Sequence, residues 1–564
     1  MKIQNHSVQA LLDEIYKAYL EIPSFTHFQK GDYETASRFP DKSLPTLIHH
    51  EKIRTEYLEI IQALRSIVNL SNYDRLLLDL AAYFLDYVMF PVSPLLEKFY
   101  YLIFGITPYE MMVEPFWDQL YLFDCSSPEN VRKHVALTAD YARYAKQLHD
   151  KVFEQAERGI FLFAGVIPST IQALKIYAAV TYDCHPLNML RPGSAATTKE
   201  ISLEQAYVRQ ASKYFLDIVE FLGSEDYLQK APQGPGWGQF HNGLEYYRFL
   251  RQYHLGYDLK ASELHALGLQ LLTQATAQQA AIRERLGYDC PHATFIHQLR
   301  GKERFFPTTP DSLGALMNAI KEKLEASTAQ YFKENINTPC VVKRLDPEIE
   351  KSLTFGYFQP SIDRNREAVY YYNASGLSEK CQITSPALLA HELFPGHHFH
   401  QSYTSENEDM HPLIKAIISP TCLEGWAEYS AFLMTEVGVF DDYDEYGRLE
   451  NDKFGCARLV VDTGLNELGW SMEQARQFLL DHTFVTPQMA ESETIRYAYC
   501  IPAQALAYKF GNLKLMELRD RYKTIRGEKY ERREFHSLIL NSGIIPLPLL
   551  ESYIMIAAGQ EGHA

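Results

Sequence analysis

The chain has little of what several large protein classes require. Its eight cysteines are scattered singly through 564 residues, with no CxxC pair. That spacing argues against a disulfide framework and against a structural zinc site built from paired cysteines, and it predicts reduced thiols in a cytoplasmic protein. The GxSxG, P-loop and protein-kinase signatures are also missing, so a serine hydrolase or a nucleotide-binding enzyme has no support.

Positive charge and long apolar runs are scarce as well. The 54 lysines and arginines are outnumbered by 71 acidic residues, which gives a formal net charge of −17. The average field therefore repels a phosphate backbone or an anionic membrane. The most apolar stretch, residues 159–182, contains Pro168, Gln172 and Lys175, which favour a buried helix over a membrane span. We expect no nucleic-acid or membrane partner, while the oligomeric state stays open.

Apolar residues are plentiful instead, at 46% of the chain, and aromatic residues reach 13%. This composition is typical of a globular protein with a large core. A 3.6-residue apolar period predicts a mainly α protein. The clearest periodic stretches are 57–90, 129–158, 200–222, 261–287 and 311–335.

Strand-like and linker-like segments are few. The best strand candidate is "REAVYYYN", residues 366–373, where Val369 and three tyrosines stand in series. No long linker rich in Ser, Gly or Pro separates independent units. We therefore expect one compact unit, with a mostly helical N-terminal region (1–335) and a catalytic, metal-binding region (336–564).

The stretch "PALLAHELFPGHHFHQ", residues 386–401, begins like a zinc-hydrolase helix. Thr384, Ser385 and Pro386 predict a helix start directly before it. The histidine spacing is unusual, however, because the residues after His391-Glu392 do not supply a second histidine four positions on. On an ideal helix His397 would be turned away from His391 by about 120°, and the next histidine would stand about 10.5 Å further along the axis.

Pro395 and Gly396 supply a reason for this spacing. Proline has no N–H to donate to the carbonyl of His391 and clashes with it, and glycine permits backbone conformations closed to other residues. The sequence therefore predicts a break in the helix that lets His397 take the place of the second ligand. The choice between His397 and His398 stays open; in the first case His398 would face the outer shell or the substrate.

A third ligand is offered by "TCLEGWAEYSAFL", residues 421–433, where Glu424 and Glu428 lie one turn apart on a predicted helix. Catalytic zinc commonly has three protein ligands and one water. We therefore predict one zinc ion bound by His391, His397 and Glu424, with Glu428 orienting a ligand histidine. Manganese, cobalt or iron would also suit this ligand set.

These segments resemble a known family. "AHELFPGHHFHQ", "EGWAEYSA", "RLVVDTGLNELGWSMEQA", "ESETIRYAYCIPAQALAYKFG" and, earlier, "GLEYYRFLRQYHLGYDLKASELHALGLQ" are similar to the bacterial domain of unknown function 885 and, more broadly, to gluzincin metallopeptidases. The likeness covers roughly residues 150–550. Two positions depart from the family pattern: Asn466 stands where a histidine is expected, and Ala503 where a glycine is expected.

The resemblance implies a large helical gluzincin-like fold, with a small β element near 366–373 beside the active-site helix and a deep cleft. Such a cleft favours oligopeptides or a terminal residue over folded proteins. The "REAVYYYN" segment is then either an edge strand that pairs with an extended peptide, including Tyr371 as a substrate contact, or a buried strand. Gln401 is a further polar candidate in the cleft.

The expected activity is hydrolysis of a peptide or amide bond through a metal-bound water, with Glu392 as general base. Tyr497 and His398 are candidates for the donor to the oxyanion. Arg496, beside Tyr497, is a candidate for binding a substrate carboxylate.

Two alternatives remain at this point. One is a metal-dependent hydrolase of a small non-peptide amide in a specialised metabolic pathway. The other is a catalytically silent helical binding protein that keeps a structural metal. The substrate, the end from which a peptide would be cut, and the biological pathway are not fixed by the residues.

Overall fold

The computed structural model describes residues 6–25, 28, 33–34, 36–66, 70–90, 96–107, 120, 122–178, 185–193, 195–350, 356–361, 367–377 and 379–559. None of its described helices is both long and apolar enough to cross a bilayer. The seven cysteines in the described part of the chain are all unpaired. The prediction of a mainly α protein is confirmed, and strands are confined to one small sheet in the part described.

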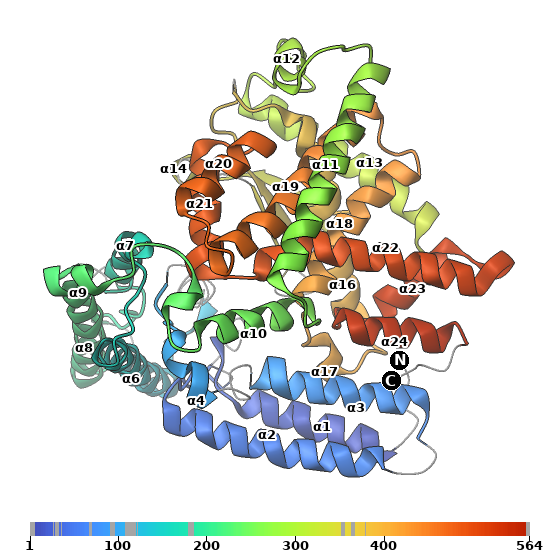
Figure 1. Ribbon diagram of the computed structural model, residues 1–564. Coiled ribbons are helices and arrows are strands. Elements are labelled where there is room, and N and C mark those ends of the chain that lie inside the picture. Colours follow the sequence, from blue (N-terminus) through green and yellow to red (C-terminus); the bar gives the residue numbers. More distant parts are fainter. Residues whose placement is uncertain are drawn as a thin grey trace.

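Three helices lie side by side at the base of the molecule (Figure 1). They are α1 (His6–Glu21), α2 (Leu44–Arg65) and α3 (Asn72–Phe84). The single periodic stretch expected over 57–90 is therefore interrupted. The cause is a local cap, because the side chain of Ser71 accepts a hydrogen bond from the backbone N–H of Asp74 and starts a new helix. A π-helical turn, Leu85–Met89, follows α3.

A second group of helices forms a lobe at one side (Figure 1, left). Its members are α6 (Pro128–Glu157), α7 (Ile167–Ala178), α8 (Thr198–Gly223) and α9 (Glu225–Lys230), and the short α4 (Leu96–Phe99) lies between this lobe and the basal helices. The helices expected over 129–158 and 200–222 are thus confirmed. Thr197 and Glu200 form a capping box at the start of α8, which satisfies backbone donors at that end of the helix.

The chain then crosses to the upper part of the molecule. The elements on this path are α10 (Gly243–Leu255), α11 (Ala261–Arg285), α12 (His292–Gln298), α13 (Pro310–Tyr331) and α14 (Pro347–Glu350). The long α11 crosses the front of the view in Figure 1. It packs closely on a later helix, because a Cβ atom added to Gly268 would lie 2.8 Å from Val460 Cγ2.

The sheet has three short strands in the order β1-β3-β2. They are β1 (Cys340–Arg344), β2 (Tyr357–Gln359) and β3 (Ala368–Tyr372). β3 pairs in parallel with β1 and antiparallel with β2. The strand expected near 366–373 is present, with Arg366 outside the described residues. It is the central strand, so the edge-strand interpretation of this segment is wrong and the buried alternative holds.

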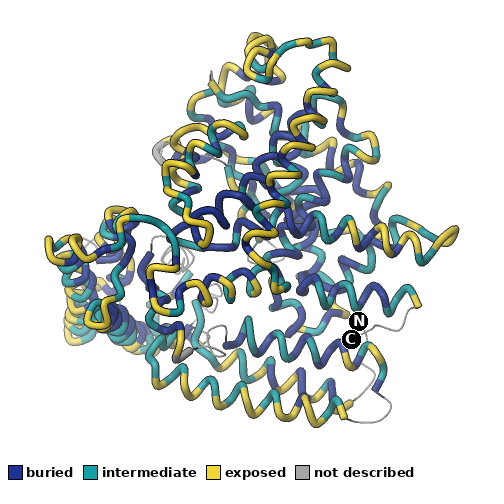
Figure 2. Tube along the Cα trace, in the orientation of Figure 1, coloured by how far each residue is buried: buried dark blue, intermediate teal, exposed yellow. Residues whose placement is uncertain are grey.

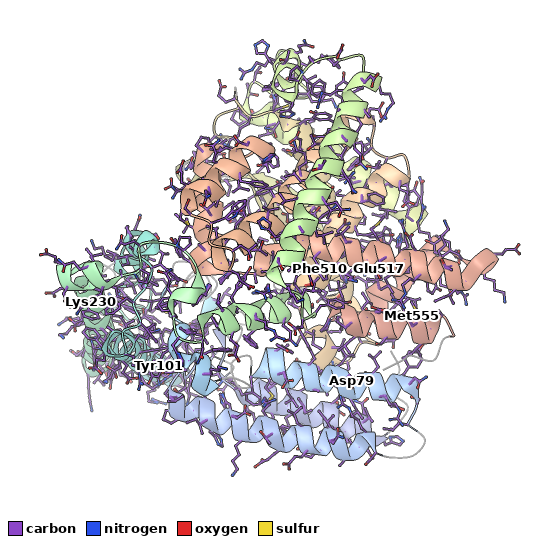
Figure 3. All side chains as sticks on the ribbon, viewed as in Figure 1. Asp79, Tyr101, Lys230, Phe510, Glu517 and Met555 are labelled. Carbon is purple, nitrogen blue, oxygen red and sulfur yellow. The ribbon has the colours of Figure 1, made fainter. Side chains whose placement is uncertain are left out.

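The remaining helices include the three that carry the predicted metal ligands, α15, α16 and α18. The full set is α15 (Ser385–Glu392), α16 (His397–Glu406), α17 (Pro412–Lys415), α18 (Pro420–Glu436), α19 (Asp442–Asn466), α20 (Met472–His482), α21 (Pro487–Ile495), α22 (Ala507–Arg526), α23 (Arg532–Ser542) and α24 (Leu547–Ala557). The most continuous burial runs through the middle of this group (Figure 2). α22 buries Phe510 and exposes Glu517, both labelled in Figure 3.

The core does not divide at residue 335. One large apolar cluster joins side chains of the lobe, such as Tyr141 and Phe215, to Leu459 and Phe510. A second joins the basal helices to the region that follows the sheet. Each cluster therefore takes residues from both predicted regions, and the second includes side chains of the helices that carry the predicted ligands.

Candidate metal centre

The helix that carries the first histidine stops where the sequence indicates. α15 ends at Glu392 and α16 begins at His397, with a non-helical turn between them. Gly396 is required in that turn, because a Cβ atom at this position would lie 1.9 Å from the carbonyl oxygen of His391. The predicted break is thus confirmed, and its effect is to bring His397 beside His391, with ring centroids 4.6 Å apart.

Three side chains from three helices converge at this point. His391, His397 and Glu424 each place one potential ligand atom in a group whose members all lie within 4.8 Å of one another. Glu424 Oε2 lies 3.5 Å from His391 Nε2 and 3.4 Å from His397 Nε2. α18 supplies the glutamate, while α15 and α16 supply the histidines.

These separations suit a tetrahedral metal ion. Bonds of about 2.0–2.1 Å from zinc to nitrogen and oxygen place the ligand atoms roughly 3.4 Å from each other along a tetrahedral edge. Glu424 Oε2 is buried and has no hydrogen-bond partner among the described residues, and the same is true of His397 Nδ1. A buried carboxylate oxygen without a donor is costly, and a cation among the three ligand atoms would satisfy it.

The neighbours of Glu424 hold this geometry in place. The indole Nε1 of Trp426 donates to the carbonyl of Pro395 at 2.9 Å, which ties α18 to the turn between the histidines. Gly425 lets α22 approach, since a Cβ atom there would lie 2.6 Å from the carbonyl carbon of Gly511. Glu428 Oε1 lies 3.3 Å from His391 Nδ1, on the side away from Glu424. The structure thus places Glu428 where a carboxylate that orients a ligand histidine would stand.

The electrostatics of the metal-free centre show strong coupling. Burial disfavours a charged imidazole, but the carboxylates of Glu424 and Glu428 outweigh it and raise the pKa of His391 to about 10. Burial also acts to raise the pKa of Glu424, yet the imidazoles of His391 and His397, 3.5 and 3.4 Å from its Oε2 atom, hold that pKa well below its ordinary value. The acidic groups therefore favour a positive charge at this point.

The centre opens on a cavity of about 660 Å³. Glu392 and Gln401 line it together with the three convergent side chains, as does β2, the outer strand of the sheet. Tyr508 of α22 also lines it, and its ring stacks on His391 with centroids 6.0 Å apart and planes 12° apart. Burial raises the pKa of Tyr508, so its hydroxyl keeps its proton.

Two side chains predicted to contact the substrate or the oxyanion, those of His398 and Tyr371, do not line the cavity. The ring of His398 packs against Phe394 and Phe358, and its Nδ1 lies 3.3 Å from Ser402 Oγ. This histidine is outside the convergent group, and burial lowers its pKa to about 4. The ring of Tyr371 contacts that of Tyr357, with centroids 5.3 Å apart and planes tilted by 36°, while its strand neighbours line the cavity.

Tyr497 and Arg496 form part of a buried network. The hydroxyl of Tyr497 donates to Glu493 Oε2 and accepts from Arg458 Nε at 3.0 Å. Arg496 donates to Glu493 at 2.8 Å and to Gln504 at 3.0 Å. Neither side chain lines the cavity, whereas Arg458 does.

Tyr508 and Arg458 are among the cavity residues that the sequence analysis did not assign to the site. Tyr508 stands two residues after the "IPAQAL" element, and in a chain with 38 tyrosines nothing in the sequence distinguishes it. Arg458 stands four residues before Asp462, and this spacing suggests a helical ion pair. The structure instead directs Asp462 to Tyr247, whose hydroxyl donates at 2.6 Å.

The two departures from the family pattern lie in this same network. The amide of Asn466 donates to the carbonyl of Tyr497 at 3.0 Å. Ala503 adopts a positive φ of 70°, the left-handed region that favours glycine. Its N–H donates to Asp462 Oδ2 at 2.9 Å, so the strained backbone is held by a buried hydrogen bond.

The fold and the convergent side chains define a mainly helical protein with a two-histidine, one-glutamate group beside a deep cavity. The chain belongs to the family described as "Bacterial protein of unknown function (DUF885)", which matches residues 29–554. No curated protein matches it.

Two solved structures share the fold. A protein from Colwellia psychrerythraea, named a lipoprotein, is 20% identical with a TM-score of 0.79, over 98% of this chain and 99% of that one. A lipoprotein of unknown function from Shewanella oneidensis is 15% identical with a TM-score of 0.77, over 97% of this chain and 99% of that one. An oligoendopeptidase F from Bacillus anthracis is 12% identical with a TM-score of only 0.32, too low for a common fold.

Proposed function

We propose that this protein is a metal-dependent hydrolase, with zinc as the preferred ion, that cleaves a peptide or amide bond in a small substrate. The observation that carries the proposal is the spacing of 3.4 and 3.5 Å between Glu424 Oε2 and the two imidazole Nε2 atoms. In this proposal His391, His397 and Glu424 hold the ion, and the arrangement is gluzincin-like.

The ion, when bound, lowers the pKa of a water and polarises the substrate carbonyl. Glu392 follows the first ligand directly and lines the cavity. In the proposal its carboxylate takes a proton from the water whose oxygen adds to the carbonyl carbon. It then delivers that proton to the nitrogen of the breaking C–N bond. The products are a carboxylate and an amine.

Tyr508 replaces Tyr497 as the proposed donor to the oxyanion. Its ring lies against His391 and its hydroxyl remains protonated, whereas Tyr497 is engaged by Glu493 and Arg458. Glu428 fixes the ring of His391 by accepting from Nδ1, which leaves Nε2 free to bind the ion.

The size of the cavity bears on the substrate. About 660 Å³ lies within the range of small-molecule sites, roughly 300–1,000 Å³. This supports a short peptide or a small amide over a folded protein. A cytoplasmic location is part of the proposal, on the strength of seven unpaired cysteines.

The test is the Glu392→Gln variant, which keeps the shape of the side chain and removes the base. Loaded with zinc, it should bind one ion per chain like the natural protein and lose at least a hundredfold in hydrolysis of peptide and acyl-amino-acid mixtures followed by mass spectrometry. Turnover equal to that of the natural protein would remove Glu392 as the base. A silent binding protein would be indicated if the natural, zinc-loaded protein cleaved none of these amides.

A further inference from the structure

The cavity wall includes the guanidinium of Arg458, which shares its ion-paired carboxylate with a second arginine. Arg458 of α19 lines the cavity beside the metal centre, with 13% of its side chain exposed. Its central carbon lies 4.1 Å from the ring of Phe454 and 4.2 Å from the ring of Tyr508. Held between two aromatic faces, the planar group has little freedom to turn.

The hydrogen bonds of Arg458 use only part of its donor set. Nε donates to the hydroxyl of Tyr497 at 3.0 Å, and Nη2 lies 3.3 Å from Glu493 Oε2. Nη1 has no hydrogen-bond partner among the described residues. A guanidinium has five N–H donors, so an open pair remains at the cavity wall.

The ion pairs around Arg458 set two positive charges against one negative charge. Arg458 and Arg496 share a single carboxylate, that of Glu493. Asp462, four residues along the helix from Arg458, is directed instead to Tyr247 and the N–H of Ala503. An anion that binds beside Arg458 is therefore stabilised by charge attraction. The cost of removing the guanidinium from water has already been incurred on folding.

The position of Arg458 relates this anion site to the proposed chemistry. Tyr508 contacts both groups, since its ring centroid lies 4.2 Å from the guanidinium carbon of Arg458 and 6.0 Å from the imidazole centroid of His391. These two distances limit the separation of Arg458 from the His391 ring to about 10 Å. One or two residues of extended chain, at about 3.3–3.6 Å each, together with the metal and hydrogen bonds at either end, span such a distance.

Two other cations line the cavity, and both are less suited. Arg448 is held by a bidentate pair with Glu445, at 2.7 Å for both bonds. Lys380 donates to Ser375 at 3.3 Å, and neither residue stacks on the ring that covers His391. A planar fork also matches a carboxylate in two bonds, which an ammonium does not.

We propose that Arg458 binds the carboxylate of the substrate, and that the substrates are amides with a free carboxylate one or two residues from the bond that breaks. An unblocked peptide has one main-chain carboxylate, at its C-terminus. The protein would therefore release one or two residues from the carboxyl end of short peptides, or split an N-acyl amino acid. This inference rests on the proposed hydrolytic function and adds the substrate class and the direction of cleavage.

The test compares matched substrates. Zinc-loaded protein is given a mixture of N-acetylated pentapeptides with free C-termini, and the same mixture as C-terminal amides, with products identified by mass spectrometry. The free acids should be cleaved with kcat/KM about 10- to 100-fold above that of the amides, the range expected for a hydrogen-bonded charged pair. Products should be shortened by one or two residues at the carboxyl end. Equal cleavage of acids and amides would overturn the inference, and this arm needs no variant to fold.

Variants then assign the preference to a residue. Arg458→Gln should lower kcat/KM for the acids by about 10- to 100-fold and bring the acid-to-amide ratio close to one. Arg458→Lys, which keeps the charge without the fork, should fall between the two and serves if the first variant does not fold. Arg448→Gln and Lys380→Gln should keep the ratio of the natural protein. A ratio that disappears with either of these, and not with Arg458, would contradict the assignment.

A binding measurement separates this inference from the hydrolytic proposal. Calorimetry of zinc-loaded Glu392→Gln protein with the same peptides should show tighter binding of acids than of amides, lost when Arg458→Gln is added. If the natural protein cleaves neither mixture, the hydrolase proposal fails, and the calorimetry alone decides the carboxylate site. Equal affinity for acids and amides would reject the site even if both mixtures are cleaved.

Discussion

The indole N–H of Trp426 donates to the carbonyl oxygen of Pro395 at 2.9 Å. This bond links the helix that carries Glu424 to the turn that separates His391 from His397. The helix of Glu424 is thus attached to the turn that positions both histidines, and this attachment does not depend on a metal ion. In the "EGW" sequence, Glu424 is a potential ligand, Gly425 lies at the close helix crossing, and Trp426 donates the hydrogen bond to the turn.

The clamp predicts the effect of Trp426→Phe. Phenylalanine retains most of the packing but leaves the Pro395 carbonyl without its donor, which costs about 1–3 kcal/mol for a buried group. The turn loosens as a result, so zinc affinity should fall while the fold persists. Competition with a chromophoric chelator measures the affinity, and unchanged zinc affinity would show that the turn is held by other contacts.

The helix crossing predicts a contrast between two glycines. Gly425→Ala would place a Cβ atom 2.6 Å from Gly511 carbonyl carbon and force α18 and α22 apart, a change that costs about 1–3 kcal/mol when a packed core is overfilled. Both the thermal midpoint and the zinc content should drop. Gly455→Ala is the control, because its added Cβ atom meets Lys509 Cβ at an ordinary 3.5 Å. The crossing is not tight if both variants behave alike.

Two tyrosines make a second matched pair. Tyr508→Phe should lower kcat by about 10- to 1,000-fold with little change in KM, as loss of an oxyanion donor does. Tyr497→Phe should instead lower the melting temperature, because its hydroxyl bonds Glu493 and Arg458 inside the protein. Steady-state kinetics and thermal unfolding of both variants test this assignment. A larger kcat loss in Tyr497→Phe would reverse the roles.

The Asp462 carboxyl predicts a pH dependence of stability. Burial raises its pKa to about 7, against the opposing effect of hydrogen bonds from Tyr247 and Ala503. Because the folded protein then holds the proton more tightly than the unfolded chain, stability from this group is present below about pH 4 and is lost as the pH rises through about 7. The free energy of unfolding of the natural protein, relative to Asp462→Asn, should fall by about 1.4 kcal/mol per pH unit in that window.

Paired urea titrations between pH 4.5 and 8 measure this difference. Above the folded pKa the two curves should run parallel. A difference in urea midpoint that is constant across the range would show that Asp462 is already ionised at low pH in the folded protein.

Local chemistry made much of the fold and site predictable. Pro395 and Gly396 act on the carbonyl of His391 through backbone sterics alone, so the helix break and the approach of His397 followed from the residues. The starts of α6 and α8 are likewise fixed by local caps, at Ser127 and Thr197. The interrupted helix at Ser71 was missed although its cap is also local, because the apolar period continued across the gap.

The roles of long-range partners were not accessible from the chain. Arg458 and Asp462 have the spacing of a helical pair, yet a tyrosine more than 200 residues earlier takes the aspartate. Tyr497 and Tyr508 are indistinguishable by sequence, and only the packing of α22 on α18 brings the second one to His391. The middle position of β3 likewise depends on β2, a strand of three residues whose alternation is too short to recognise.

The central claim is that His391, His397 and Glu424 bind one metal ion, and metal analysis of matched histidine variants tests it most directly. Purified protein, His397→Gln and His398→Gln are each dialysed with a small excess of zinc, washed, and measured by plasma mass spectrometry. We predict about one zinc per chain for the natural protein and for His398→Gln, and less than about a tenth for His397→Gln, because a catalytic zinc needs three protein ligands. A natural protein without stoichiometric metal, or a loss of zinc in His398→Gln with retention in His397→Gln, would contradict the account.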